Sequence, residues 1–186
     1  VNGDVPILRI SAKTGQGFDA LEELLAQEGN FGRRILDLDY DIYAEGEAEL
    51  GWLNSSLTMS ASKEFELDDL LLEIVRSLRE RLGAEKYETA HLKVIGLWEG
   101  FFGVANLVSR DSEPELSLPS HSRVREVDLI VNARVATDPA VLENFVREAV
   151  LKAGEAREAQ VDFRHTQSFR PGRPVPTHRY AANTME

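Results

Sequence analysis

The sequence predicts an α+β protein in which two helices cover one face of an antiparallel sheet. Segments 66–82 and 138–154 repeat apolar residues at helical spacing. Segments before, between and after them alternate apolar and polar residues, as half-buried strands do. The order of these segments along the chain is that of a sheet with two helical crossovers.

Composition excludes several classes of protein. The 186 residues, 42% of them hydrophobic, are enough to bury the core of one ordinary domain plus an appendage. The lack of cysteine excludes disulfides and thiolate metal sites and agrees with a cytoplasmic location. No apolar run approaches the roughly 20 residues of a membrane helix. A net charge of −11 repels phosphate backbones, so we expect neither a membrane nor a nucleic acid as partner.

The first elements form a strand, loop and helix unit. Residues 5–10 are a short apolar run that predicts a buried strand, and the glycine-rich segment 11–17 predicts a turn. Phe18, Leu21, Leu24 and Leu25 then repeat at helical spacing. Gly29 and Gly32 end that helix, so we place a domain boundary near residue 35. Because the chain starts at Val1 with this unit, we expect a piece of a longer protein.

The remaining elements belong to a second domain, residues 36–170. The acid-rich segment 37–49 is assigned to a helix, and Gly83 is expected to end the strong helix 66–82. Asp138 and Pro139 are suited to cap and start the second long helix. Residues 111–123, with two prolines, are predicted to be a surface loop. Strands are predicted at 51–60, 91–98, 101–109, 124–136 and 159–169, the second and third joined as a hairpin.

Without the extra hairpin strand, the order from Gly51 is strand, helix, strand, strand, helix, strand. This is the split βαβ, or ferredoxin-like, order. In that arrangement the helices cover one face of the sheet, and the other face is free to meet a partner. Residues 171–186 form a tail that contains proline and arginine, suited to bind a partner, to bind an acidic surface of its own molecule, or to fray.

One motif carries functional information. The segment Ile10-Ser11-Ala12-Lys13-Thr14-Gly15-Gln16-Gly17 resembles the last guanine-recognition motif of small GTPase domains, in which a Ser-Ala-Lys tripeptide joins the final strand to the final helix. The resemblance implies that Ala12 offers a backbone donor to the guanine, Ser11 shapes the turn and Lys13 flanks the base. Residues 1–35 would then be the last strand and helix of a P-loop GTPase domain.

A wider resemblance covers most of the chain. Residues 40–54, Tyr-Asp-Ile-Tyr-Ala-Glu-Gly-Glu-Ala-Glu-Leu-Gly-Trp-Leu-Asn, and the pattern after them are similar to the C-terminal region of the CobW-like, cobalamin-synthesis family of metal-handling GTPases. The resemblance implies an upstream domain that uses GTP and Mg²⁺, and coupling of GTP hydrolysis to delivery of a transition metal ion or a cobalamin cofactor. The expected partners are that GTPase domain and a client metalloprotein or second subunit.

The sequence also departs from the family. It contains no G-x-x-x-x-G-K-[ST] phosphate loop, no D-x-x-G segment and no N-K-x-D base-specificity motif. Without them the phosphates and Mg²⁺ have no cradle, so we expect no GTP hydrolysis by these residues alone. The segment from residue 36 is accordingly interpreted as an accessory domain without catalytic residues.

Two other functions stay open at this point. One is a free-standing ferredoxin-like module that binds a small ligand or associates with itself through its sheet. The other is an enzyme that uses Glu99, Arg164 and His165 on the sheet as acid and base groups. Neither group of possible metal ligands has the spacing of a metal site. The acids of 37–49 lack the glycine of a calcium loop. The four histidines are far apart in sequence, at His91, His121, His165 and His178.

Overall fold

The computed structural model describes residues 7–12, 14–28 and 39–175. The chain divides into two compact units, and the larger one is Leu38–Val175. Among the described residues, no helix is both long and apolar enough to cross a membrane.

The smaller unit contains a turn and one short helix, α1 (Phe18–Leu25). Residues 7–10 form no strand, so the strand predicted for 5–10 is not found in its described part, and its first two residues lie outside the described ranges. A strand exists only where a neighbouring strand accepts and donates its backbone hydrogen bonds, and no described strand pairs with this segment. None of the residues of α1 is buried.

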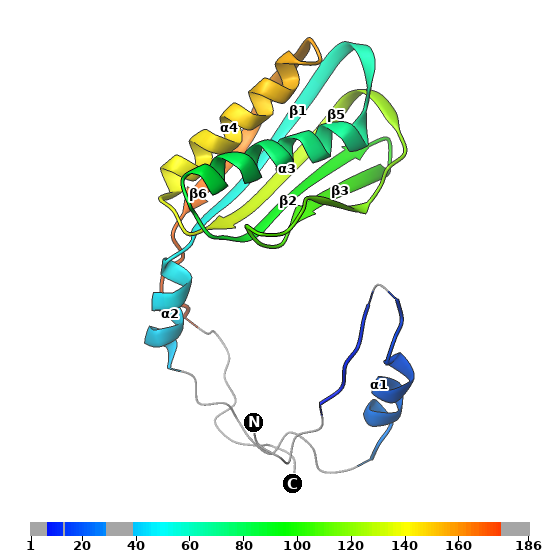
Figure 1. Ribbon diagram of the computed structural model, residues 1–186, viewed down its shortest axis with the longest axis vertical. Coiled ribbons are helices and arrows are strands. Elements are labelled where there is room, and N and C mark those ends of the chain that lie inside the picture. The colour runs from blue at the N-terminus through cyan, green and yellow to red at the C-terminus, as the bar shows by residue number, and fades with distance from the viewer. Residues whose placement is uncertain (1–6, 13, 29–38, 176–186) are drawn as a thin grey trace. The chain divides into compact units, whose positions relative to one another are not determined.

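The larger unit is an α+β domain built on one antiparallel sheet. The sheet has the order β4-β3-β2-β5-β1-β6, and every neighbouring pair is antiparallel. Helices α3 and α4 lie on the same face of the sheet (Figure 1). The elements are α2 (Tyr40–Ala48), β1 (Gly51–Glu66), α3 (Leu67–Ala84), β2 (Thr89–Trp98), β3 (Phe101–Leu107), β4 (Glu115–Leu118), β5 (Arg123–Val135), α4 (Pro139–Glu155) and β6 (Ala159–Phe169).

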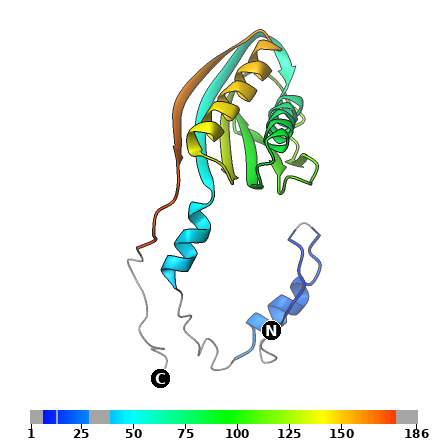
Figure 2. The ribbon, with the colours of Figure 1, turned by 60° about the vertical axis from the view of Figure 1, so that its left-hand side comes forward.

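Two helical crossovers determine the layers. Helix α3 joins β1 to β2, and α4 joins β5 to β6, each returning to a strand two places away in the sheet. The apolar stripe of α3 is fully buried against the sheet, which confirms the helical spacing of its leucines. Side chains on one face of β1 and β5 complete the core, including Leu57, Met59, Leu129 and Val131. Seen from the side, neither α3 nor α4 covers the other face (Figure 2).

The structure corrects two predicted boundaries. Gly83 does not end α3 but lies inside it: the helix ends at Ala84, and the positive φ of 60° falls on Lys86, three residues after Gly83. Residues 115–118, predicted to be part of a loop, form β4, because they pair with β3 at the edge of the sheet. Asp138 caps α4 as predicted, its carboxylate accepting a hydrogen bond from the N–H of Ala140 at 2.8 Å.

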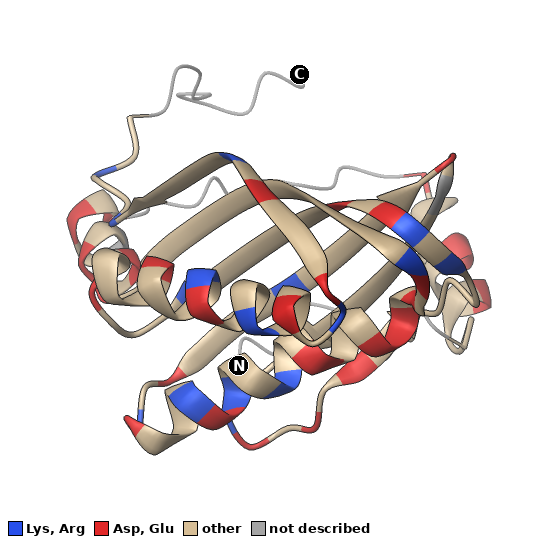
Figure 3. Cartoon of the chain, turned by 90° about the horizontal axis from the view of Figure 1, so that it is seen from above, with Lys and Arg blue, Asp and Glu red and all other residues tan. Residues whose placement is uncertain are grey.

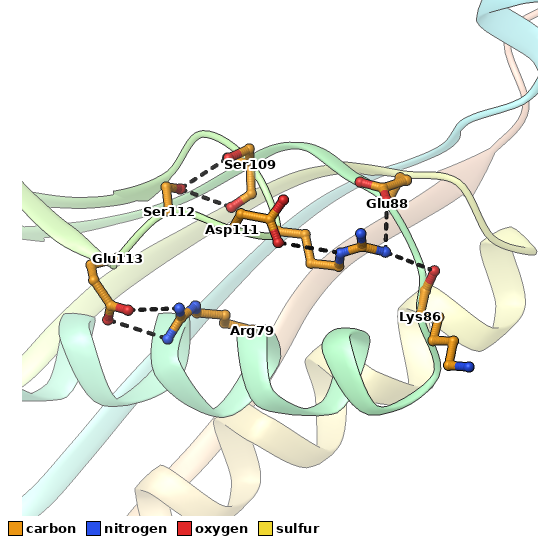
Figure 4. A network of polar contacts seen from close by, with 8 residues as sticks. Arg79, Lys86, Glu88, Ser109, Asp111, Ser112 and Glu113 are labelled. Carbon is orange, nitrogen blue, oxygen red and sulfur yellow. Dashed lines mark hydrogen bonds and ion pairs between the residues drawn. The ribbon is translucent and has the colours of Figure 1, made fainter.

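Ion pairs fix the segment between β3 and β4 against α3. Arg79 of α3 binds both carboxylate oxygens of Glu113, at 2.6 and 3.2 Å (Figure 4). Arg110 contacts Glu88 at 2.6 Å, before β2 begins. The outer surfaces of α3 and α4 carry acidic and basic residues in close alternation (Figure 3). These exposed pairs make the helical layer a mixed, solvated surface.

Helix α2 is held by the segment that follows β6. Asp39 caps α2 through hydrogen bonds from the N–H groups of Asp41 and Ile42. Arg170 donates to the carbonyl oxygens of Ala48 and Thr137, and Arg173 pairs with Asp41 at 2.8 Å. Within the described part of the tail, Arg173 thus contacts one acidic residue of its own molecule.

Candidate functional site

The first candidate site is the turn at residues 11–17. The N–H of Gly15 donates to the carbonyl of Ser11 at 2.9 Å, and the N–H of Ser11 donates to the carbonyl of Gln16 at 3.0 Å. The Ser11 hydroxyl also accepts a hydrogen bond from the N–H of Thr14 at 3.3 Å. Gly15 and Gly17 have φ of 75° and 79°, a conformation that glycine adopts without strain. Ser11 therefore takes part in three hydrogen bonds of the turn.

The N–H of Ala12 is among the donors of this turn that stay available. Ala12 is exposed, and its N–H makes no hydrogen bond to any described residue. An exposed N–H without a described hydrogen-bond partner is suited to bind a carbonyl oxygen of a planar base. Lys13, the third predicted site residue, lies outside the described residues. The turn brings Ser11 and Ala12 together, and these two residues are the part of the predicted site that can be placed.

The smaller unit also exposes an unusual amount of apolar surface. Ile7 and Leu25 are 72% and 75% exposed, and Ile10 is 49% exposed. Leu8 and Phe18 are exposed to a lesser degree. A segment with no buried residue in its helix cannot gain the free energy that normally stabilises a strand and helix pair. These side chains are therefore suited to be covered by further protein.

The second candidate site is the face of the sheet opposite α3 and α4, here called the open face. Because side chains alternate along each strand, its residues follow from the buried ones, and the strand register aligns them in rows across the sheet. The rows differ in chemistry from one end of the strands to the other.

The row nearest the start of β1 is basic and aromatic. It runs through His91, Arg134, Trp52 and Phe169 by direct strand pairing. The guanidinium carbon of Arg134 lies 3.9 Å from the centre of the Trp52 ring, a cation–π contact. Burial, together with the charges of Lys93 and Arg134, lowers the pKa of His91 below its usual value. This end of the open face is therefore locally positive in a strongly acidic protein.

The next row is made of amides and one lysine. Asn106, Lys93, Asn132, Asn54 and Gln167 are aligned on five successive strands. The amide nitrogen of Asn132 donates to the amide oxygen of Asn54 at 2.6 Å. Beyond it lies an aliphatic row, with Val104, Ile95 and Ile130 paired in the same way.

The far rows are acidic. Leu97, Asp128, Thr58 and Asp162 are aligned, and Glu126 follows Asp128 on the same face of β5. Thr58 donates to Asp128 at 3.0 Å, and Arg164 pairs with the same carboxylate oxygen at 3.0 Å. Sequence reasoning did not identify these rows. The alternation of polar and apolar residues in 126–134 was the available signal, but the alignment across strands depends on pairing.

The structure does not bring together the acid and base groups proposed for an enzyme. Glu99 lies in the turn after β2, with a φ of 44°, whereas Arg164 and His165 lie on β6. Two strands, β5 and β1, separate β2 from β6, so at about 4.8 Å per strand the strands are roughly 14 Å apart. Arg164 instead pairs with Asp128. The spacing of these strands therefore gives that enzyme hypothesis no support.

The candidate metal ligands are likewise dispersed. Among the described residues, no three His, Asp or Glu side chains are grouped so as to hold a metal ion. His91 and His165 lie on different strands, His121 lies in the loop before β5, and His178 is outside the described residues. Of the acids in 37–49, Asp39 caps α2 and Asp41 pairs with Arg173.

The aromatic residues around the β2–β3 turn have different environments. Trp98 packs against the core, whereas Phe102 is 50% exposed on the open face. The side chain of Phe101 is not among those described. Phe102 pairs with Leu97, which is 39% exposed, so the two form an apolar patch beside the aliphatic row.

On the helical side, a groove of about 480 Å³ lies between α3 and α4. Its lining includes Glu80, Arg81, Glu148 and Lys152. Arg81 both pairs with Glu148 and lies over the Phe145 ring at 4.3 Å, so these charges join the two helices. The groove is explained by helix packing.

Comparisons of the chain with protein-family models, with curated proteins and with solved structures find no significant match.

Proposed function

We propose that residues 36–170 form the accessory, non-catalytic interaction domain of a CobW-like GTPase, which couples GTP hydrolysis to delivery of a metal ion or cobalamin cofactor. The observation that carries this proposal is the open face, a six-stranded surface that α3 and α4 leave uncovered. Its graded charge and its exposed apolar residues are features of a surface that binds protein. The partners would be the GTPase domain and a client or second subunit.

The assignment of the fold supports the same proposal. The four strands β2-β5-β1-β6, with helical crossovers α3 and α4, have the order of the split βαβ unit, and β3 and β4 extend it at one edge. We therefore assign the larger unit to the ferredoxin-like class. In this class one sheet face is generally available for a partner or ligand, which agrees with a role in interaction.

The smaller unit supports the GTPase part of the proposal. The 11–17 turn presents the unpaired N–H of Ala12, as a guanine site would require. The exposed Ile7, Ile10 and Leu25 would be covered by the rest of a nucleotide-binding domain. GTP and Mg²⁺ would be bound mainly by residues outside this sequence, and the turn would contribute only base recognition.

The test uses the complete reading frame that encodes these residues. We expect the purified product to bind a fluorescent GTP analogue and to prefer it to the ATP analogue. Ala12→Pro removes the N–H and should weaken binding of the GTP analogue at least about tenfold, equivalent to one hydrogen bond of roughly 1.4 kcal/mol. Ala12→Ser keeps the N–H and should bind as the wild type does. No binding of the GTP analogue, or equal effects of both substitutions, would reject the GTPase assignment.

A further inference from the structure

Strand β5 presents charges of opposite sign at its two ends. Its side chains on the open face are Glu126, Asp128, Ile130, Asn132 and Arg134. Ile130 lies at the midpoint, with the acids on one side and the amide and guanidinium on the other. If the strand is reversed about Ile130, Arg134 takes the place of Glu126 and Asn132 takes the place of Asp128. The strand is therefore complementary to a reversed copy of itself.

The neighbouring strands repeat this polarity. Lys93 on β2 lies beside Asn132 at the basic end, and Asp162 on β6 lies beside Thr58 at the acidic end. Among the described residues, Lys93, Arg134 and Glu126 take part in no ion pair. Their charges are thus not neutralised within the domain and are suited to bind charges of a partner.

An apolar zone separates the two charged ends. Ile95, Ile130 and Val104 are only partly buried, and they lie side by side midway along the strands. Phe102 and Leu97 extend this zone toward the acidic end. A partner that covers the open face would remove these side chains from water, which is the main favourable term in protein association.

We propose that the open face binds a second copy of this chain, with the strands of the two sheets running in opposite directions and the two-fold axis crossing the strands at the aliphatic row. The inference rests on the interaction role proposed above and names its second subunit. In this arrangement Ile130 packs near its own symmetry mate, and the basic end around Arg134 covers the acidic end around Glu126. The contact is isologous, so each charged pairing occurs twice.

The charges select this arrangement over its alternative. A two-fold axis parallel to the strands would place each row on itself, so Arg134 would approach Arg134 and Glu126 would approach Glu126. Like charges facing each other across an interface cost up to several kcal/mol. Packed sheets in proteins also align within about 30° of each other, which keeps the two ends of each strand over opposite ends of the partner.

The open face is large enough for such a contact. Six strands about 4.8 Å apart span roughly 24 Å, and residues 126–134 of β5, at about 3.3 Å per residue, span roughly 26 Å. Because β3 and β4 are shorter than β5, the projected area is at most on the order of 600 Å², before the relief of the side chains is included. Stable interfaces bury about 800 Å² of accessible surface per partner. A face-to-face dimer therefore lies within the usual range.

The experiment is a charge exchange read by sedimentation velocity over a range of protein concentrations. The wild type should dimerise at concentrations of about 100 µM or lower. Arg134→Glu and Glu126→Arg, each alone, should weaken the dimer at least about tenfold, because each places like charges together twice. An equimolar mixture of the two variants should dimerise again, because both contacts then join Glu to Arg.

The controls separate charge from folding. Arg76→Glu and Glu80→Arg make the same charge changes on the exposed surface of α3 and should leave the dimer unchanged. Thermal melts establish that each variant folds. The equimolar mixture can restore the dimer only if both variants are folded. The inference would be overturned if the wild type were monomeric at about 100 µM, or if Arg134→Glu and Glu126→Arg left the dimer affinity unchanged. Ala12 belongs to the smaller unit. The GTP-binding measurement with its variants therefore tests the proposed function independently of the dimer.

Discussion

The carboxylate of Asp68 accepts two hydrogen bonds from Ser120, one from its N–H and one from its hydroxyl, both at 2.8 Å. A third comes from the N–H of His121 at 3.0 Å. Beside them, the N–H of Leu67 donates to the carbonyl of Ser122 at 3.0 Å. The first turn of α3 therefore anchors the loop that leads into β5, the central strand of the open face.

Asp68→Asn should destabilise the protein by roughly 1–3 kcal/mol, because the amide retains one acceptor for donors that now bind both carboxylate oxygens. Urea denaturation at neutral pH measures this change. Asp69→Asn is the matched control, since it removes the same charge from the same exposed turn and should cost no more than about 1 kcal/mol. Equal effects of the two substitutions would mean that the loop contacts contribute nothing.

The same carboxylate should make stability depend on acid pH. Partial burial raises the pKa of Asp68, but the hydrogen bonds from Ser120 and His121 outweigh it, so the net pKa lies below the usual value. The unfolded state then binds the proton more readily than the folded state. The stability contributed by Asp68 is full above the unfolded pKa of about 3.9 and is lost as pH falls through the folded pKa. The difference in free energy of unfolding between the wild type and Asp68→Asn should therefore shrink as the pH falls. Urea denaturation at several pH values between 6 and about 2.5 measures it.

Two glycines in helices should respond in opposite ways to alanine. A Cβ on Gly154 of α4 would lie 2.6 Å from Cγ2 of Val161, a stiff side chain on β6, so Gly154→Ala should cost about 1–3 kcal/mol through overpacking. A Cβ on Gly83 of α3 would meet no atom within 4 Å, so Gly83→Ala should stabilise by up to about 1 kcal/mol. Thermal unfolding of the two variants measures both changes in stability. A stabilising Gly154→Ala would show that α4 can move away from the sheet at little cost.

His91 should make the basic end of the open face sensitive to pH. Burial and then the charges of Lys93 and Arg134 lower its pKa, so the unfolded chain binds the proton more readily. The stability that neutral His91 contributes should be full above the pKa of histidine in the unfolded chain, about 6.5, and should fall as the pH drops through the pKa of His91 in the folded protein. His91→Gln should remove that part of the decline. An NMR titration checks the cause directly, since Lys93→Gln should raise the pKa of His91, and an unchanged value would exclude the charge effect.

The sequence predicted the local elements of the larger unit well because each carries its own periodic pattern. Helix α3 and strand β6 follow directly from their leucines and from alternation, and Asp138 gives the start of α4. Strand β4 was missed because its four residues have almost no pattern and become a strand only by pairing with β3. Gly83 was misjudged as a helix end because glycine signals an end only where the chain needs a positive φ.

The open face could not be predicted in the same way. Its rows depend on which residues of distant strands lie opposite each other, as Asn54 does with both Asn132 and Gln167. Irregular pairing near His91 and at Arg164 further shifts the alternation within β2 and β6. At residues 11–17, by contrast, the motif itself predicted the turn, because its hydrogen bonds join residues at most five positions apart.

Arg170 should control the attachment of α2. Its guanidinium binds the carbonyl of Ala48, at the C-terminal end of α2 where helix carbonyls lack partners, and that of Thr137 before α4. Arg170→Ala should therefore increase amide hydrogen exchange across 40–48 while β1 and β5 stay protected. Arg173→Ala is the control, because its pair with Asp41 is largely exposed and should contribute no more than about 1 kcal/mol. If both substitutions loosen α2 equally, the helix is held by the exposed ion pair as much as by the hydrogen bonds to its last turn.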